Sequence, residues 1–411
     1  MIPSSERDAP ESMALPRLLL LTNEFPQTIG AGSILLYRLF QDYPSDRLLV
    51  VSNSRASAGA ELLRCRHEWL PLAADRLIQT RFWPWRAALR ALGASRLPSI
   101  RRIDRVVAGF AADLVVVVMQ DTWFYDLGAR YAAARGRPLV VVVTDLPQAF
   151  EPVPPWLRRL QHRRDATVLQ RAVCRLAVSR GMVEFFGREF GLSGELLPLP
   201  RADRPVAQDP ERCRALKVPG RLTLGFAGGL HYGYGEQFLR MLPQLRQAGT
   251  IVECFGPHPG GRLTLLKDAT DVFHFNGYLT PPERAWEELL RRCDVVLQPY
   301  LNPPGPHGLQ YRTHFPSKLG DCLALGLPLL ITGPAEASGV RWCLEHSGSA
   351  VVLTDSSPAA LAEILSRLRD DADLRVSVAR AAQAAGVVFA AAPLRTQFYR
   401  RLASLAATAA P

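Results

Sequence analysis

The chain has 411 residues, of which 48% are hydrophobic and 8% aromatic, and it carries a net charge of +11. This hydrophobic content excludes a mainly disordered protein, and the length favours two domains over one. The seven cysteines stand singly, without the Cys-x-x-Cys or Cys/His spacing of a zinc site, so we expect no metal ion and a reducing compartment.

Residues 1–16 are rich in Pro, Ser, Glu and Asp and contain no apolar run. They predict a flexible tail and not a signal peptide. The apolar runs at residues 114–119 and 139–143 are too short to span a membrane. We therefore expect a cytoplasmic protein without a membrane-spanning helix.

The first strand is expected at residues 17–22, and Ser33 can cap a helix at residues 34–42. Between them lies a Pro/Gly loop at residues 23–32. There, Gly30 and Gly32 would let backbone N–H groups approach an anion or a sugar. The loop lacks the G-x-G-x-x-G spacing, and a plain strand–helix connection is the commoner meaning of such a sequence.

Further apolar runs predict strands at residues 48–52, 113–119, 139–144, 175–179 and 195–197, with helices at 85–110, 122–135 and 155–172. Continuous Val/Leu strands that alternate with helices are typical of a parallel sheet covered on both faces. In such sheets, ligands bind beyond the carboxyl ends of the strands. Asp145 directly follows one strand, so it is a candidate acid or base, and a turn-forming Asp before Leu146-Pro147 is an equal alternative.

Much of the positive charge lies in two stretches. Residues 76–105 hold eight Arg and one Asp, together with Phe82, Trp83 and Trp85, and residues 158–188 hold eight Arg, one Asp and one Glu. Clustered Arg with Trp suits an anionic membrane surface, and a solvated Arg-rich face is an equally good explanation. The sequence contains no recognisable nucleic-acid-binding module, so we expect no nucleic-acid partner.

Residues 198–221, which are rich in Pro, Arg and Asp, predict a linker. A second series of elements opens with a strand at 222–227, a glycine loop and a helix at 236–247. Further strands are expected at 251–255, 272–275, 294–298, 329–332 and 350–353, and helices at 282–292 and 316–325. We therefore expect two domains, 17–197 and 222–392. Residues 393–411 would carry a helix that returns to the first domain.

Residues 312–334 are the best candidate for a functional stretch. Pro316 suits the first position of a helix, which places Lys318 in the first turn. There its ammonium would join free backbone N–H groups and the positive end of the helix dipole, and a bound anion would offset the repulsion. An ordinary helix with a solvated Lys is the alternative, and for this pattern alone it is the commoner one.

Three stretches resemble a known family: FAGGLHYGYGEQ (226–237), FNGYLTPPERAWEELLRRCDVVLQPY (275–300) and FPSKLGDCLALGLPLLITGP (315–334). They look like the C-terminal domain of retaining glycosyltransferases of the GT-B fold, of the glycosyltransferase group 1 type. FPQTIGAGS (25–33), TDLP (144–147) and the closing helix also fit. The resemblance implies an α/β protein of two Rossmann-like doubly wound domains. The second would bind a nucleoside-diphosphate-sugar donor and the first a hydroxyl acceptor.

The resemblance also implies roles for single residues. Family members carry an E-x7-E pair, whose second Glu binds the nucleotide ribose. That Glu falls on Asp321, which keeps the carboxylate, and the first falls on Thr313, which is uncharged. The Arg and Lys that commonly hold the diphosphate fall on Gly229 and about Tyr234.

Because that cationic pair is missing, other groups must meet the charge on the leaving diphosphate. Lys318 is the main candidate for this task. The surrounding candidates are Gly229, His231, Arg312, His314 and Ser317, although His231 is as well explained as an ordinary loop residue.

The remaining positions concern the base and the acceptor. Tyr278 falls where relatives line the base pocket, or is a buried turn residue. Asp145 stands where many relatives have a His-Asp pair, and here Thr144 replaces the His. Asp145 would orient the acceptor or take its proton.

The sequence therefore predicts a membrane-peripheral retaining glycosyltransferase without a cofactor besides its donor substrate. The basic, Trp-bearing stretch suggests a lipid-linked or surface-polysaccharide acceptor. Two alternatives stay open. One is a sugar-nucleotide epimerase with the GT-B fold, and the other is a catalytically silent GT-B module, which the uncharged Thr313 and the missing Arg/Lys pair favour.

Overall fold

A computed structural model describes residues 15–71, 100–120, 124–147 and 154–408 of the chain. Most of the predicted tail lies outside these residues. So do Phe82, Trp83 and Trp85 of the first basic stretch, and the first part of the predicted helix at 85–110.

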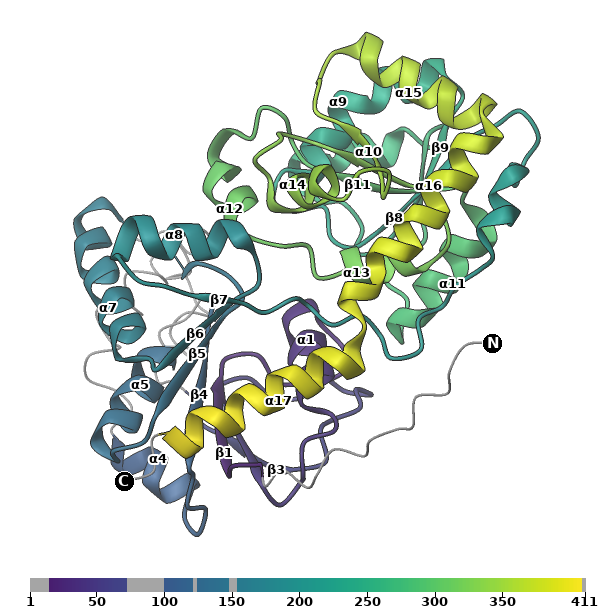
Figure 1. Ribbon diagram of the computed structural model, residues 1–411. Helices are drawn as coiled ribbons and strands as arrows, with labels where there is room; N and C mark the ends of the chain where they lie inside the picture. The colour runs from purple at the N-terminus through teal and green to yellow at the C-terminus, as the bar shows by residue number, and fades with distance from the viewer. Residues whose placement is uncertain (1–14, 72–99, 121–123, 148–153, 409–411) are drawn as a thin grey trace.

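The first half is built on a seven-stranded parallel sheet with the order β3-β2-β1-β4-β5-β6-β7 (Figure 1). Its strands are β1 (Leu18–Thr22), β2 (Leu48–Ser52), β3 (Arg66–Trp69), β4 (Leu114–Met119), β5 (Leu139–Val143), β6 (Cys174–Ala177) and β7 (Glu195–Leu196). Every residue of β1, β4 and β5 is buried, as the apolar runs predict for central strands covered on both faces. The edge strand β3 was missed because its sequence, RHEW, contains no apolar run.

Helices flank this sheet on both faces. They are α1 (Ala31–Phe40), α4 (Ile100–Val106), α5 (Phe124–Ala134), α7 (Arg158–Arg171, preceded by the 3-10 turn η2, Pro155–Leu157) and α8 (Arg180–Phe190). The predicted Ser33 cap is wrong. Gly30, with φ +93°, occupies the N-cap of α1, and Ser33 lies inside the first turn, where its hydroxyl donates to Glu24.

The second half is built on a six-stranded parallel sheet with the order β10-β9-β8-β11-β12-β13. Its strands are β8 (Thr223–Ala227), β9 (Ile251–Phe255), β10 (Phe273–Phe275), β11 (Val295–Pro299), β12 (Leu329–Thr332) and β13 (Val351–Leu353). Its helices are α9 (Tyr234–Gln247), α10 (Thr264–Asp268), α11 (Pro282–Arg292), α12 (Gly308–Thr313), α13 (Leu319–Ala324), α14 (Ser338–Glu345), α15 (Pro358–Asp370) and α16 (Ala372–Ala385). The 3-10 turns are η3 (Pro210–Arg214), η4 (Gly261–Leu263), η5 (Gly305–His307) and η6 (Gly386–Phe389).

Strand order reverses at the same place in both sheets. β1 lies between β2 and β4, and β8 lies between β9 and β11. The crevice beyond the carboxyl end of such a strand is where open α/β sheets bind ligands. The loops after β1 and after β8 are therefore the two places from which a site can be built.

The final helix, α17 (Ala391–Thr408), returns to the first half, as predicted (Figure 1, yellow). Its Phe398 ring packs edge-on against Phe40 of α1, and the Tyr399 hydroxyl donates to the Leu39 carbonyl at 2.9 Å. By length and hydropathy alone, the stretch Ala372–Thr408 could cross a membrane. It comprises α16, η6 and α17, and core helices of globular domains meet the same criteria.

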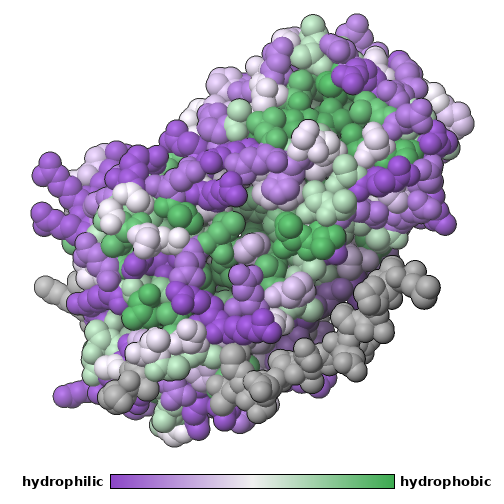
Figure 2. Space-filling view, in the orientation of Figure 1, coloured by the Kyte–Doolittle hydropathy of each residue, from purple (hydrophilic) through white to green (hydrophobic). Residues whose placement is uncertain are grey.

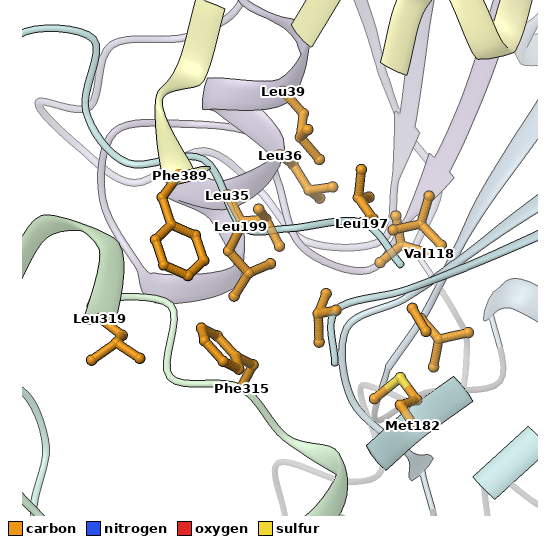
Figure 3. Close-up of a cluster of buried hydrophobic side chains, with 14 of the residues drawn as sticks. Leu35, Leu36, Leu39, Val118, Met182, Leu197, Leu199, Phe315, Leu319 and Phe389 are labelled. Atoms are coloured by element: carbon orange, nitrogen blue, oxygen red, sulfur yellow. The ribbon is translucent and has the colours of Figure 1, made fainter. Parts of the chain in front are cut away.

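The two halves meet through an apolar cluster (Figure 3). Leu35 from α1, Leu199 from the segment that joins the sheets, Phe315 and Leu319 around the start of α13, and Phe389 from η6 are all buried there. Figure 2 shows hydrophobic residues gathered in the middle of the face in view, among polar ones. Apolar packing therefore holds the halves together next to the loops that follow β1 and β8.

Candidate functional site

A cavity of about 370 Å³, open to solvent, lies between the two halves. The first half contributes α1 and the residue before it, the connecting segment contributes Leu199 and Pro200, and the second half contributes the remaining wall. Seven of the predicted site residues line this cavity: Gly30, Gly229, His231, Tyr278, Ser317, Lys318 and Asp321. Residues that are far apart in the sequence thus share one site.

The Lys318 side chain lies next to the carboxyl end of β8, and the residue is not in the first turn of a helix. Residues 316–318 form a turn, with Leu319 N–H donating to the Pro316 carbonyl, so α13 begins only at Leu319 and Lys318 occupies its N-cap. The predicted helix start at Pro316 is therefore wrong. The Lys318 ammonium donates to the Ala227 carbonyl at 2.5 Å and lies 3.9 Å from the centre of the Phe226 ring.

The surroundings of this ammonium leave its charge uncompensated. In the parts of the chain that the structure describes, no carboxylate lies within ion-pair distance of Lys318. Burial lowers its pKa to about 8, with smaller opposing effects from Cys322 and Cys254. A partly buried cation held by a carbonyl and an aromatic face is suited to an anionic ligand.

The loop after β8 brings His231 to the same place. A Cβ atom at Gly229 would lie 2.0 Å from the Cε1 atom of the His231 ring, so only glycine leaves room for the ring there. Burial lowers the pKa of His231, and the charges of Lys318 and His314 lower it further. The ring is therefore neutral at neutral pH and can act as a hydrogen-bonding group beside the Lys318 cation.

The other end of the cavity is apolar. Tyr278 is 53% exposed and lines it together with Leu279, Pro282 and the largely buried Trp286. This combination can hold a flat ring by stacking and apolar contact. Sequence reasoning missed Trp286, which lies within the predicted helix at 282–292 and was not singled out.

Asp321 is held from the first half of the molecule. One carboxylate oxygen accepts from Arg38 of α1 at 2.8 Å, and the other accepts from the Ala202 N–H at 2.8 Å. Arg38 also donates to the Pro200 carbonyl, and both charged side chains are buried. Sequence reasoning missed Arg38, because nothing in the sequence links it to a carboxylate 283 residues away.

Asp145 follows β5 directly, as predicted, and it contacts the other half. Its Oδ1 atom lies 2.9 Å from Nδ1 of His314. Neither residue is among those that line the cavity, although His314 is close enough to lower the pKa of His231. An imidazole from the second half thus stands beside the carboxylate, where Thr144 in the sequence offers none.

The remaining candidates lie away from the cavity. Thr313 is buried, its hydroxyl donates to the Leu309 carbonyl within α12, and its carbonyl accepts from the Ser179 hydroxyl of the first half. Arg312 is exposed on α12, and Gly32 lies within the first turn of α1. The structure does not bring these three residues to the site.

Side chains that commonly bind metals do not gather in the described ranges: no group of three or more His, Cys, Asp or Glu residues is placed to hold an ion. Of the seven cysteines, all but the half-buried Cys65 are buried, and all are unpaired. They fill core positions, as small apolar residues do.

Known structures match almost the whole chain. The structure of HepE of Anabaena in complex with UDP and glucose is similar with a TM-score of 0.64 at 16% identity, covering 95% of this chain and 100% of that one. Sucrose-phosphate synthase from Thermosynechococcus elongatus gives 0.66 at 12% identity, with 94% and 99% covered. Arabidopsis thaliana UGT89C1 in complex with UDP gives 0.57 at 12% identity, with 94% and 100% covered.

No protein-family model and no curated protein matches the chain. At these identities the likeness to known structures establishes the fold. The chain has the GT-B fold of two Rossmann-like domains, as predicted.

Proposed function

We propose that the chain is a glycosyltransferase that moves a sugar from a nucleoside-diphosphate donor to a hydroxyl acceptor. The observation that carries the proposal is the uncompensated charge of Lys318 at the head of a cavity between two Rossmann-like halves. A diphosphate would neutralise this charge. The structures of HepE and UGT89C1 contain UDP, so UDP-sugars are the first donors to test.

The geometry suggests a division of tasks. Transfer breaks the bond between the sugar C1 and a diphosphate oxygen and forms a bond from C1 to the acceptor oxygen. Lys318 and the backbone N–H of Gly229 would stabilise the charge that develops on the diphosphate. Tyr278 and Trp286 would hold the base. Asp321 would face the ribose, and its bonds to Arg38 and Ala202 would fix its orientation.

On the acceptor side, Asp145 would orient the hydroxyl or take its proton, supported by its contact with His314. We propose transfer with retention, on the strength of the motif at 315–334. The anomeric configuration of the product, measured by NMR, tests retention separately from transfer itself.

The first experiment incubates the protein with UDP-, GDP- and ADP-sugars and measures nucleoside-diphosphate release with and without candidate hydroxyl acceptors. We expect acceptor-dependent release with one base class. A changed sugar without any acceptor would instead identify an epimerase. Nucleotide binding without turnover would identify a silent module, and absence of binding by all three nucleotides would refute the proposal.

We further propose that the protein works at an anionic membrane surface, on the cytoplasmic side, with a lipid-linked acceptor in glycolipid or surface-polysaccharide assembly. Trp156 is 63% exposed directly before α7, where Arg158, Arg159 and Arg163 are also exposed. Such a helix can bind a surface by charge and an interfacial Trp. We expect co-sedimentation with vesicles that contain phosphatidylserine, and loss of it in Trp156→Ala/Arg159→Ala; binding to neutral vesicles alone would contradict the proposal.

A further inference from the structure

The loop after β8 contains an unusual backbone conformation. Tyr232 has φ +62° and is the one non-glycine residue with positive φ in the described part of the chain. Gly228 and Gly233 on either side also have positive φ, but glycine adopts it without strain. A bulky residue in this region is strained, and it stays there only if its surroundings hold it.

One buried side chain supplies that restraint. The Tyr311 hydroxyl donates to the Tyr232 carbonyl at 2.6 Å and accepts from the Leu301 N–H at 3.1 Å. A Cβ atom at Gly233 would lie 2.6 Å from this hydroxyl, so the glycine leaves the space that the contact needs. Tyr311 is 2% exposed, and its ring is fixed edge-on against Tyr300 and stacked on His307.

The residue held in this way is next to the candidate donor site. Tyr232 directly follows His231, whose ring lies over Gly229 and lines the same cavity as Lys318. A change at the Tyr232 carbonyl would therefore move the His231 imidazole, which lines the cavity. Tyr311 itself is not among the residues that line the cavity.

We propose that Tyr311 is a positioning residue for the donor diphosphate. Its hydroxyl keeps the loop at 228–233 in the strained conformation that presents the His231 imidazole to the ligand. The proposal rests on the proposed function in so far as the ligand is a nucleoside diphosphate.

The test compares Tyr311→Phe with Tyr300→Phe. Each change removes one oxygen from a fully buried ring of the same aromatic cluster, and within the described residues the Tyr300 hydroxyl has no hydrogen-bond partner in the loop at 228–233. We expect Tyr311→Phe to raise the Kd for UDP about tenfold by calorimetry, as for one lost hydrogen bond with two buried groups left unpaired. Tyr300→Phe should change it less than twofold. Equal weakening by both variants would refute the proposal, because loss of core stability would then explain the result.

A second measurement does not need the nucleotide. The His231 imidazole titrates under the influence of Lys318 and His314, so its pKa, measured by NMR on the ligand-free protein, reports where the ring lies. We expect the pKa to rise towards its ordinary value in Tyr311→Phe and to stay unchanged in Tyr300→Phe. An unchanged His231 titration in Tyr311→Phe would overturn the positioning role. If wild-type protein binds no nucleotide, the proposed function fails, and the titration still decides whether Tyr311 holds the loop.

Discussion

The loops after β1 and after β8 have the same topology and different chemistry. Each follows a central strand and ends on a glycine with positive φ that serves as the helix N-cap, Gly30 before α1 and Gly233 before α9. In the first loop, the side chains bind neighbouring segments: Gln27 donates to Ser57, which follows β2, and Glu24 accepts from Ser33 of α1. In the second, the neutral His231 and the positively charged Lys318, which is distant in the sequence, line the cavity.

The topology that the two loops share comes from the fold, and the chemical difference between them indicates which loop binds a ligand. The parallel sheet supplies a switch-point loop in each half, with backbone N–H groups near the crevice. Among the described residues, the second loop has beside it a cation without a carboxylate partner, Lys318, which comes from a turn 91 residues further along the chain. We therefore place the donor at the second loop.

Arg38→Ala should have the largest effect, because it breaks the buried ion pair between Arg38 of α1 and Asp321 of the second half. Removing one partner of a buried ion pair leaves Asp321 charged and without a cation, with the Ala202 N–H as its remaining partner, and we expect a loss of about 3–5 kcal/mol in the free energy of unfolding by denaturant titration. The matched control is Arg38→Met/Asp321→Leu, which removes both charges and should cost far less. A loss below about 1 kcal/mol in the single variant would show that the pair contributes little.

Lys318→Ala should lower the transfer rate about 10²–10³-fold, the effect of losing one donor that stabilises developing negative charge. Lys267→Ala, on the exposed face of α10, is the matched control and should leave the rate unchanged. The comparison of the loops would be wrong if Glu24→Gln, at the first loop, weakened UDP binding as strongly as Lys318→Ala.

Gly229→Ala in the second loop and Gly32→Ala in the first turn of α1, just after the first loop, measure how tightly the backbone is packed at each place. The new Cβ at 229 would displace the His231 ring, and we expect a cost of about 1–3 kcal/mol in UDP binding by calorimetry. At Gly32, the nearest atoms are 3.2 and 3.3 Å away, on Gln120 and Glu24, and alanine favours the helix by up to about 1 kcal/mol. Gly32→Ala should therefore change binding and stability by less than about 1 kcal/mol. Similar losses of UDP binding free energy in both variants would contradict the proposed difference between the loops.

The pH dependence should be small near neutral pH and should grow above pH 8. Burial lowers the pKa of Lys318 from 10.5 to about 8, so UDP affinity should fall by up to about tenfold per pH unit above pH 8. The stability contribution has the opposite sign. Between pH 8 and 10.5 the unfolded chain binds the proton and the folded one does not, so stability from this group rises with pH. Calorimetry and denaturant titration against Lys318→Met measure both trends, and parallel trends would contradict the assignment.

The fold could be predicted from local sequence because the central strands are unbroken apolar runs. The runs LLLLT, LVVVVM and LVVVV all became buried strands of one sheet. The edge strand β3 was missed because none of its residues is buried, so its sequence contains no apolar run. The start of α13 was placed too early, because a proline that suits a first helical turn also suits the preceding turn that the chain adopts here.

The site could be predicted only in part. Lys318, His231 and Tyr278 were found because a motif carries them, and the structure brings them to one cavity. The contacts Arg38–Asp321 and Asp145–His314 could not be foreseen, because they join residues 283 and 169 positions apart. Such contacts depend on how the two halves dock, which no local pattern determines.

The path of the backbone between the halves has a mechanical consequence. The chain passes from the first sheet to the second after β7 and comes back at η6, and these two connections touch, since the Arg201 N–H donates to the Phe389 carbonyl at 2.9 Å. Two connectors joined at one point act as a single pivot. Rotation about that point stretches neither connector, whereas sliding or pulling apart would strain both, so widening of the crevice for ligand exchange should follow a hinge-like path centred on Arg201 and Phe389.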